Sequence, residues 1–387
     1  MTRVVVSPYG VASFPEGGGH FWVYMQYVQG LLRSGCEVYW LERFHSRGDA
    51  AHDARARATL LERLAACGLG GKVLLYTQDE RPDGAEAPID FIGVARSEAE
   101  AVLRQADLLL NFHYAIDPRL LAGPKRTALV DIDPGLLQLW MSTGQLRVPR
   151  HDVYLTIGET VGTPAALFPD CGLQWIHIRP PVCLELWPYT YDPASEAFTT
   201  VAGWWSGKWV KETRDGREIL YENTKRVSLL EFAELPRLTS QALELALYLA
   251  DQDGPDRQLL ESYGWRVRHS REVAGTPGAY RAYIQGSRGE FSSAKPSCMR
   301  FQNAWVSDRS LCYLASGKPV VVQDTGPSAY LPNGEGMFRF ATLAEAAAAV
   351  DAVNADYERH CRAARALAAA YFDATAVAGT ILREALR

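Results

Sequence analysis

The stretch that decides the fold is RVVVSPYGVASFPEGGGHFWVYMQYVQGLLRSGCEVYWL, which spans residues 3–41. The apolar run Val4–Val6 is typical of a buried parallel strand, and a long glycine-rich loop follows it. Apolar residues then recur at helical spacing as far as Leu32, and Gly35 stands where a helix C-cap glycine is expected. A second strand is indicated at Glu37–Leu41. This order predicts the first βαβ unit of a doubly wound α/β domain.

The alternation continues through the first half of the chain. Short apolar runs predict more buried strands, and longer stretches between them predict helices. The expected strands are Val73–Tyr76, Leu108–Leu110, Ala128–Val130, Val153–Ile157 and Trp175–Ile178, and the expected helices include Ala54–Cys67 and Glu98–Gln105. The pair Pro180-Pro181 and the turn-rich segment after it interrupt this pattern. A domain boundary is therefore predicted near residue 187.

The second half begins the pattern again. Residues 203–228 show no clear periodicity and are interpreted as a long loop, whereas residues 241–250 are interpreted as a helix. The other expected strands are Phe198–Ala202, Trp265–Arg268 and Val320–Val322, and the other expected helices are Leu311–Ala315, Leu343–Val353, Tyr357–Tyr371 and Val377–Ala385. Two α/β halves with a cleft between them are the architecture that this order predicts.

Composition narrows the classes of function. The formal net charge is -5, which gives the chain no overall attraction to nucleic acid or anionic lipid. The seven cysteines are scattered and never form a CxxC pair, so neither a disulfide framework nor a zinc site is expected. No run of 18 apolar residues could span a bilayer. We expect a cytoplasmic protein without a membrane span, a nucleic-acid partner or a bound metal.

The first candidate site is the loop Glu16-Gly17-Gly18-Gly19-His20. Glycines let backbone N–H groups approach an anion, and the helix start behind them adds unpaired donors and a positive dipole end. Gly18 and Gly19 are therefore candidates for binding the diphosphate or the sugar ring of a donor substrate. The motif is not GxGxxG, however, and it also suits a plain tight turn. His20 is a candidate general base, and the alternative is a capping or donor-contact histidine.

Polar residues follow two further strands of this half. His113 comes just after Leu108–Leu110, and Asp131 and Asp133 follow Ala128–Val130. Because the carboxyl ends of parallel strands face the ligand crevice, His113 is a candidate catalytic residue. The two aspartates resemble a metal-binding pair, but acidic residues before Pro-Gly are ordinary turn formers. We interpret them as a turn or as a polar contact to an acceptor.

The strongest candidate lies between Gly289 and Gly326. Ser307 or Asp308 can cap the following helix, which places Arg309 and Ser310 in its first turn. An arginine, a hydroxyl and a helix N-terminus together suit a phosphate group. The next strand ends at Val322, so Asp324, Thr325 and Gly326 also face the predicted crevice. The alternative is a surface helix with a cap and a solvated arginine.

These stretches resemble the GT-B glycosyltransferases, in which two Rossmann-like doubly wound domains face each other across a cleft. The segment Gly17-Gly-Gly-His-Phe with Leu32-Arg-Ser-Gly-Cys-Glu-Val is similar to the N-terminal signature of that group. Tyr313-Leu-Ala-Ser-Gly-Lys-Pro-Val320 is similar to its turn below the donor. Ser307-Asp-Arg-Ser310, Gln323-Asp-Thr-Gly326 and Leu331-Pro-Asn-Gly-Glu-Gly336 resemble a bacterial branch of it.

The resemblance implies an acceptor domain at residues 1–187, a nucleotide-sugar domain at 188–371, and a last helix at 372–387 that crosses back to the first domain. It implies a nucleotide-diphosphate sugar as donor substrate, held mainly by the second domain, and no cofactor or required metal. A lysine or arginine early in the second domain would neutralise the diphosphate. Lys225 and Arg226 are the candidates, and Lys208 is a further one.

The sequence departs from the pattern at one important place. The paired glutamates E-x7-E of large retaining families are absent, because Ala304 and Cys312 occupy those positions. Glu290, farther upstream, could fill one of the two roles. Retention and inversion therefore both stay open. In an inverting reaction His20 or a carboxylate would deprotonate the acceptor, and in a retaining one the leaving diphosphate could assist.

The expected function is transfer of a hexosyl group from a nucleotide-diphosphate sugar to an acceptor hydroxyl. A small molecule such as a natural product and a glycan are both open as acceptors. Trp204 and Trp205 could stack on the sugar or base, or could serve as core plugs. The rival functions are a nucleotide-sugar epimerase on the same fold and a non-catalytic protein that binds a sugar or nucleotide.

Overall fold

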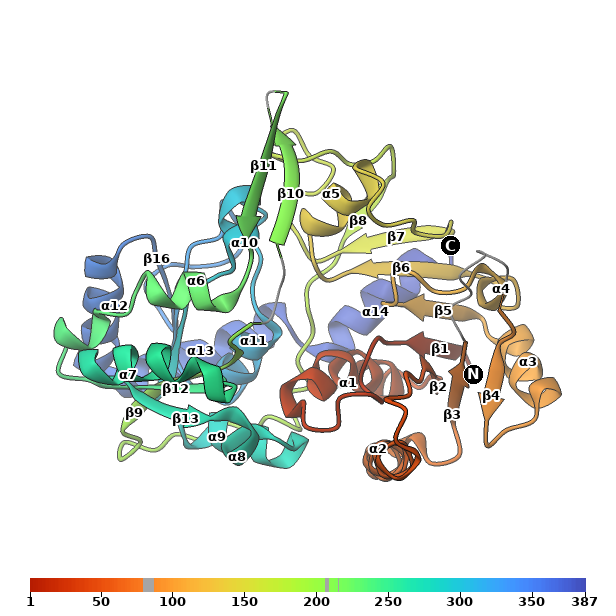
Figure 1. Cartoon of the computed structure of the whole chain (residues 1–387), viewed down its shortest axis with the longest axis horizontal. Helices are drawn as coiled ribbons and strands as arrows, with labels where there is room; N and C mark the ends of the chain where they lie inside the picture. Colours follow the sequence, from red (N-terminus) through yellow and green to blue (C-terminus); the bar gives the residue numbers. More distant parts are fainter. Residues whose placement is uncertain (79–86, 206–208, 215) are drawn as a thin grey trace.

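The computed structural model describes residues 1–78, 87–205, 209–214 and 216–387. Two α/β halves lie side by side, and each is built on its own sheet (Figure 1). The first sheet ends at His177 and the second begins at Ala197, so the boundary predicted at residue 187 falls in the connection between them. The predicted α/β class, with two Rossmann-like units, is confirmed by this arrangement.

The first sheet has the order β4-β3-β2-β1-β5-β6-β7-β8, and every pair in it is parallel except β3 with β4. Its order reverses at β1, whose central residues Val4–Val6 are fully buried between β2 and β5. The strands are β1 (Arg3–Ser7), β2 (Glu37–Arg43), β3 (Val73–Thr77), β4 (Asp90–Ile92), β5 (Leu108–Asn111), β6 (Thr127–Asp131), β7 (Val153–Thr156) and β8 (Trp175–His177). The helices are α1 (Gly18–Arg33), α2 (Ala50–Leu64), α3 (Arg96–Gln105), α4 (Pro118–Leu121) and α5 (Leu136–Ser142).

The second sheet is wholly parallel and has the order β13-β12-β9-β14-β15-β16, which reverses at β9. Its strands are β9 (Ala197–Gly203), β12 (Ala242–Tyr248), β13 (Arg266–His269), β14 (Gly289–Ser292), β15 (Val320–Gln323) and β16 (Met337–Phe340). Its helices are α6 (Lys225–Leu230), α7 (Gly254–Tyr263), α8 (Ser270–Ala274), α9 (Pro277–Gly286), α10 (Pro296–Phe301), α11 (Asp308–Ala315), α12 (Leu343–Ala355) and α13 (Tyr357–Tyr371). Ligands of such sheets bind beyond the carboxyl ends of the strands at these reversal points.

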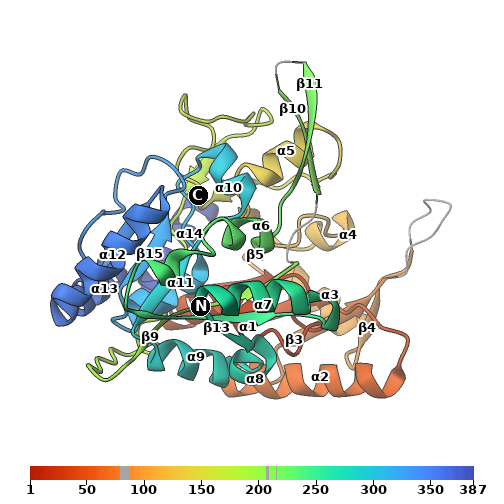
Figure 2. The same ribbon diagram turned by 60° about the vertical axis from the view of Figure 1, so that its left-hand side comes forward.

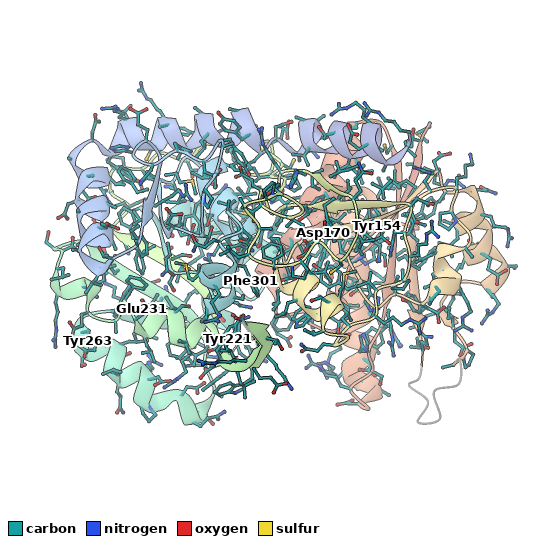
Figure 3. All side chains as sticks on the ribbon, turned by 90° about the horizontal axis from the view of Figure 1, so that it is seen from above. Tyr154, Asp170, Tyr221, Glu231, Tyr263 and Phe301 are labelled. Carbon is teal, nitrogen blue, oxygen red and sulfur yellow. The ribbon has the colours of Figure 1, made fainter. Side chains whose placement is uncertain are left out.

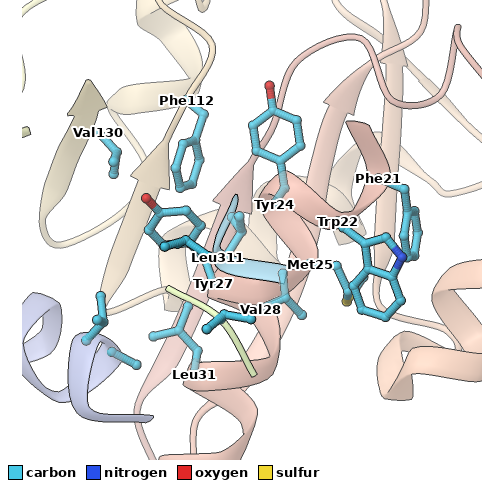
Figure 4. Packing of buried hydrophobic residues seen from close by; sticks show 14 of the residues in the cluster. Phe21, Trp22, Tyr24, Met25, Tyr27, Val28, Leu31, Phe112, Val130 and Leu311 are labelled. Atoms are coloured by element: carbon cyan, nitrogen blue, oxygen red, sulfur yellow. The ribbon is translucent and has the colours of Figure 1, made fainter. Parts of the chain in front are cut away.

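The two halves share a hydrophobic core around α1. Buried residues of α1 pack in one cluster with α11 and α9 of the second half, and Leu311 of α11 lies among α1 side chains such as Tyr27 and Val28 (Figure 4). The last helix, α14 (Ala374–Ala385), also packs on α1. At that contact Gly30 makes room for the chain at Ala374, since an added Cβ would lie 2.2 Å from its carbonyl oxygen.

Two sequence predictions in the second half are wrong. Residues 203–228, interpreted as a loop, contain the antiparallel hairpin of β10 (Trp209–Arg214) and β11 (Arg217–Glu222), which projects from the body (Figure 2). Its inner face packs on both halves, because Val210 and Tyr221 cluster with Leu139 of α5 and Phe301 of α10. Phe301 and Tyr221 both lie near the junction of the halves in Figure 3.

Residues 241–250, interpreted as a helix, contain strand β12. Leucine and alanine favour helices, but the alternation in ALELALY places Leu243, Leu245 and Leu247 on one buried face. Pairing with β9 and β13 on both sides therefore outweighs the intrinsic preference of the segment.

Two further features concern membrane-spanning helices and the state of the cysteines. In the described part of the chain, no helix is both long enough and apolar enough to cross a membrane. All seven cysteines are free, and Cys36, Cys183, Cys312 and Cys361 are buried.

Candidate functional site

A cavity of about 840 Å³ lies between the two halves. The first half contributes the loop after β1, the start of α1 and the turn after β6. The second half contributes the ends of β9 and β12 and the starts of α6, α10 and α11. The charged lining residues are Glu16, Asp133, Lys225, Lys295, Asp308 and Arg309, and several aromatic rings lie between them.

Lys225 is the first residue of α6 and is almost buried, with 7% of its surface exposed. Its ammonium donates a hydrogen bond to the carbonyl of Ser293. Desolvation, together with the nearby positive charge of Arg309, lowers the pKa of Lys225 to about 7. An anion beside this amine would restore its charge, so the predicted donor residue Lys225 lies where it could meet a diphosphate.

Lys295 is a second cation of the cavity that the sequence interpretation did not select. It precedes α10 and follows strand β14, whose last residue is Ser292. The rule that drew attention to His113, a polar residue just past a buried strand, applies equally to Lys295. Lys225 and Lys295 together supply positive charge from the second half.

The start of α11 also faces the cavity, through Ser307 and Asp308. The Ser307 hydroxyl accepts a hydrogen bond from the backbone N–H of Arg309 at 3.3 Å, so Ser307 is the N-cap, one of the two predicted. The first turn of a helix has N–H groups without partners inside the helix, and these favour an anion. Desolvation raises the pKa of the Asp308 carboxyl.

Arg309 lines the cavity, but its guanidinium is already engaged by groups of the fold. The guanidinium forms hydrogen bonds within the second half: Nε donates to Glu290 at 2.7 Å, and Nη2 donates to the Ser292 hydroxyl at 2.7 Å. Nη1 donates to the carbonyl of Val201 at 2.9 Å. Glu290 is fully buried and does not line the cavity, so the pair joins α11 to β14 and β9 beneath the site.

Five other residues predicted for donor binding lie outside the cavity lining. Arg226 is turned to Asp256, with N–O distances of 2.6 and 2.9 Å, and Ser310 is buried within α11. Of the other three, Thr325 contacts the cavity wall, whereas Asp324 and Gly326 both accept hydrogen bonds from Arg339. Thr325 donates its hydroxyl to the carbonyl of the lining residue Trp305 at 2.7 Å, and Asp324 pairs with Arg339.

The glycines at the start of α1 line the cavity, but contact between the halves already requires two of them. A Cβ on Gly18 would lie 2.4 Å from the carbonyl oxygens of Ala274 and Thr276, and one on Gly19 would lie 2.7 Å from the Tyr280 ring. The absence of side chains here therefore lets the second half approach α1 closely. The sequence interpretation had instead explained these glycines by the close approach of the donor.

The two predicted catalytic histidines lie in different places. His20 lines the cavity, and its Nε2 is 2.8 Å from the carbonyl of Tyr9. Because a carbonyl only accepts, Nε2 carries the proton of the neutral ring and Nδ1 is the acceptor. Burial lowers the pKa of His20, and the carbonyl contact opposes this in part. His20 is therefore a neutral imidazole that lines the cavity and whose Nδ1 can accept a hydrogen bond.

His113 does not line the cavity. Its ring packs behind Tyr9, with 4.9 Å between ring centroids, and burial lowers its pKa to about 4. The prediction that His113 follows a buried strand is correct, but its ring contacts Tyr9, and Tyr9 is the residue that lines the cavity. His113 is thus a residue that supports Tyr9.

Asp131 and Asp133 lie in different environments, because Asp131 is buried and Asp133 is exposed at the cavity. Asp131 is fully buried and accepts hydrogen bonds from Gln138 at 2.8 Å and Thr156 at 2.9 Å, which makes it part of the turn. Asp133 lines the cavity and accepts a hydrogen bond from the Tyr114 hydroxyl at 3.1 Å. Asp131 therefore takes part in the turn, and Asp133 lies where a polar contact to a ligand is possible.

Trp204 and Trp205 both line the cavity. Trp204 is fully buried and donates to Asp256 at 3.0 Å, as expected of a core plug. Trp205 is 49% exposed, and its indole N–H donates to Asp253 at 2.8 Å. Lys208 lies outside the described residues. Among those that are described, no three His, Cys, Asp or Glu side chains gather as ligands for a metal ion.

No protein-family model and no curated protein sequence matches the chain. Its structure is similar to Anabaena Alr3699/HepE, solved with UDP and glucose, with a TM-score of 0.58, 12% identity and coverage of 99% of both chains. An alpha-glucosyltransferase solved with UDP and DNA has a TM-score of 0.59 and 11% identity over 99% of both chains. AviGT4, a glycosyltransferase of avilamycin A biosynthesis, has a TM-score of 0.52 and 15% identity over 99% of this chain and 97% of its own. The chain has the GT-B fold of these glycosyltransferases.

Proposed function

We propose that the protein is a glycosyltransferase that moves a hexosyl group from a nucleotide-diphosphate sugar to a hydroxyl of a small acceptor. The observation that carries this proposal is the cavity between the halves, where Lys225 and Lys295 lie beside the start of α11. Two lysines and a helix N-terminus are an arrangement suited to a diphosphate. Structural neighbours with the same fold hold UDP, which supports a nucleotide as ligand.

The proposed reaction breaks the bond between the sugar C1 and the diphosphate and forms a bond from C1 to the acceptor oxygen. The electron pair of the broken bond goes to the diphosphate, where Lys225 and Lys295 stabilise the added charge. His20 contacts the sugar or the acceptor hydroxyl through Nδ1, and the hydroxyl proton goes there or to the departing phosphate. We propose that the two lysines supply this charge without a required metal ion.

Isothermal titration with UDP-, GDP- and TDP-sugars tests the proposal, with Lys225→Ala and Lys295→Ala beside the unaltered chain. We expect one nucleotide to bind and both substitutions to weaken it, with binding unchanged after chelation of divalent metals. Product analysis with an added acceptor then separates transfer from epimerisation of the donor and from binding alone. Absence of nucleotide binding, or full binding by both variants, would contradict the proposal.

A small-molecule acceptor is the finer part of the proposal. AviGT4 is named for a role in antibiotic biosynthesis, whereas the alpha-glucosyltransferase was solved with DNA. The net charge of -5 favours the first kind of acceptor over nucleic acid for this chain. A transfer assay that compares a sugar or polyol acceptor with duplex DNA would decide between them.

A further inference from the structure

Tyr9 is a large aromatic side chain that the fold leaves exposed at the cavity. It lies two residues after β1, the strand at which the order of the first sheet reverses. It lines the cavity, and 49% of its surface is exposed. An aromatic ring gains free energy in proportion to the area that an apolar partner removes from water. The position of Tyr9 therefore favours a ligand with an apolar face on the first-half side of the cavity.

The ring of Tyr9 is supported by two other rings of the first half. The His113 ring lies against it, with 4.9 Å between the centroids and 31° between the planes, and the His45 ring meets it edge-on at 6.1 Å. Burial keeps His113 neutral, since it lowers the pKa of that imidazole to about 4. Protein thus covers one side of the Tyr9 ring, and the exposed part is left for a ligand.

The backbone of Tyr9 is fixed as well. Its carbonyl accepts hydrogen bonds from Nε2 of His20 at 2.8 Å and from the Tyr24 hydroxyl at 3.4 Å. Both donors belong to α1, so the loop that carries Tyr9 is tied to that helix, and the ring stays beside the candidate base His20. A ring that is ordered before binding loses little conformational entropy when a ligand covers it.

Most of the remaining first-half lining is apolar. Its described aromatic and aliphatic members are Tyr9, Phe14, Val23, Tyr24, Tyr27, Ile132, Ile157, Pro180 and Pro181. Phe14 packs edge-on against Tyr248 of the second half, with 6.4 Å between ring centroids, so the aromatic surface continues across the cavity. The other described side chains of this lining that carry polar groups are Glu16, His20 and Asp133. A sugar or polyol acceptor would place several hydroxyls against apolar groups, which costs free energy unless each hydroxyl finds a partner.

The acidity of the acceptor hydroxyl also has to suit His20. A phenolic hydroxyl such as that of tyrosine ionises with a pKa of about 10, far below the pKa of an alcohol. Burial lowers the pKa of His20, which makes this imidazole a weak base. Such a base removes a proton more readily from a phenol than from an alcohol.

We propose that the acceptor is a phenol, with an aromatic ring that stacks on Tyr9 and a hydroxyl that donates to His20. This inference rests on the proposed glycosyl transfer and specifies its acceptor. The phenolic oxygen forms the bond to the sugar C1, and the electron pair of the bond from C1 to the diphosphate goes to the diphosphate. The phenolic proton goes to Nδ1 of His20. Tyr9 is the specificity-determining residue.

Four ligands test the inference: 2-naphthol, its saturated counterpart decahydro-2-naphthol, 2-methoxynaphthalene and methyl β-D-glucoside. Their binding to the UDP-loaded protein is measured by titration. We expect 2-naphthol to bind about three- to tenfold more tightly than decahydro-2-naphthol, because only the aromatic ring stacks on Tyr9. 2-Methoxynaphthalene should bind about threefold more weakly than 2-naphthol, since it cannot donate to His20. Methyl β-D-glucoside should bind most weakly of the four.

Two substitutions of Tyr9 separate the ring from its hydroxyl. Tyr9→Leu should abolish the preference for 2-naphthol over decahydro-2-naphthol, whereas Tyr9→Phe should keep it because the ring remains. The control is Tyr191→Leu, which should leave the preference unchanged. Tyr191 is also exposed, at 36%, and packs on another ring, that of Tyr357, but it lies outside the cavity lining.

Equal or tighter binding of decahydro-2-naphthol, tightest binding of the glucoside, or no detectable binding of 2-naphthol would overturn the inference. An unchanged preference in Tyr9→Leu would overturn it as well. UDP affinity of the unaltered chain reports separately on the proposed function. UDP binding without selection for the aromatic ring would refute the acceptor class alone.

Discussion

Arg309 and Lys225 are both cations at the edge of the second half, yet they lie in opposite electrostatic situations. Arg309 is paired with the buried Glu290 and bonded to Ser292 and to the chain at Val201. Lys225 has one hydrogen bond to a carbonyl and no carboxylate within ion-pair distance among the described residues. Arg309 therefore carries a charge that the fold has already neutralised, whereas the charge of Lys225 is left for a ligand.

The difference shows that position beside a helix start does not decide whether a cation can bind substrate. Arg309 stands in the first turn of α11, where an anion-binding side chain is expected, but a carboxylate from the neighbouring strand occupies it. Lys225 lies on another helix and takes part in the cavity because α6 begins there. The four predictions that follow test this contrast.

Arg309→Met should have the largest effect, and it should be on stability. Removing the guanidinium leaves Glu290 as an unpaired buried charge, which typically costs about 3–5 kcal/mol of unfolding free energy. Chemical denaturation followed by circular dichroism measures the loss. The double variant with Glu290→Gln should recover much of it. A loss below about 1 kcal/mol in Arg309→Met would show that the pair does not hold α11 in place.

Lys225→Ala should reduce nucleotide-sugar affinity about 10–100-fold, since a hydrogen bond to a charged group is worth about 1.5–3 kcal/mol. Its unfolding free energy should change far less than that of Arg309→Met, because the buried amine lacks a carboxylate partner. Titration calorimetry with UDP-glucose and a denaturation curve give the two numbers. The contrast fails if this variant unfolds easily and binds normally.

The pKa of about 7 for Lys225 predicts that donor affinity depends on pH. Below pH 7 the amine is already charged, so binding of UDP-glucose is at full strength. Above pH 7 the lysine must take up a proton on binding, and affinity should fall by up to about tenfold per pH unit. Arginine stays charged at these pH values, so Lys225→Arg should flatten the profile. A profile of the unaltered chain that is flat between pH 6 and 8.5 would contradict this prediction.

Arg226→Ala should have the smallest effect, although the residue is adjacent to Lys225 in sequence. Its ion pair with Asp256 is partly exposed, so the expected loss of stability is at most about 1 kcal/mol. Affinity for UDP-glucose should stay within about twofold of the unaltered chain, because Arg226 does not line the cavity. A tenfold loss of affinity would show that the guanidinium turns toward the donor when it binds.

Much of the fold could be predicted because its signals are local. The buried strands around Val4–Val6 and Val320–Val322 are continuous apolar runs, and the α1 segment repeats apolar residues at helical spacing. Strand β12 was missed because leucine and alanine also favour helices, and only pairing with β9 and β13 decides between the two. The β10–β11 hairpin was missed because its inner face packs on elements far away in the sequence.

The candidate site could be predicted only in part, for a similar reason. Sequence reasoning placed His20 and Ser307 at the cavity because each was expected at a helix start, and it selected Lys225 from the resemblance to GT-B glycosyltransferases. It did not select Lys295, and it left Asp133 open between a turn and a polar contact. Whether Lys295 and Asp133 can contact a ligand depends on how the two halves enclose the cavity, and only the tertiary structure decides that.

The amino-acid sequence by itself determined the two α/β halves and the loops that border the cleft, because burial of strands and capping of helices depend on neighbours in the chain. Tertiary structure alone decided which charges stay unneutralised. It placed Glu290 of β14 against Arg309 and the carbonyls of Ala274 and Thr276 against Gly18, while Lys225 and Asp133 kept access to the cavity. The reason is that a charge or a glycine acquires its role from the group it meets in space, which the order of residues along the chain does not specify.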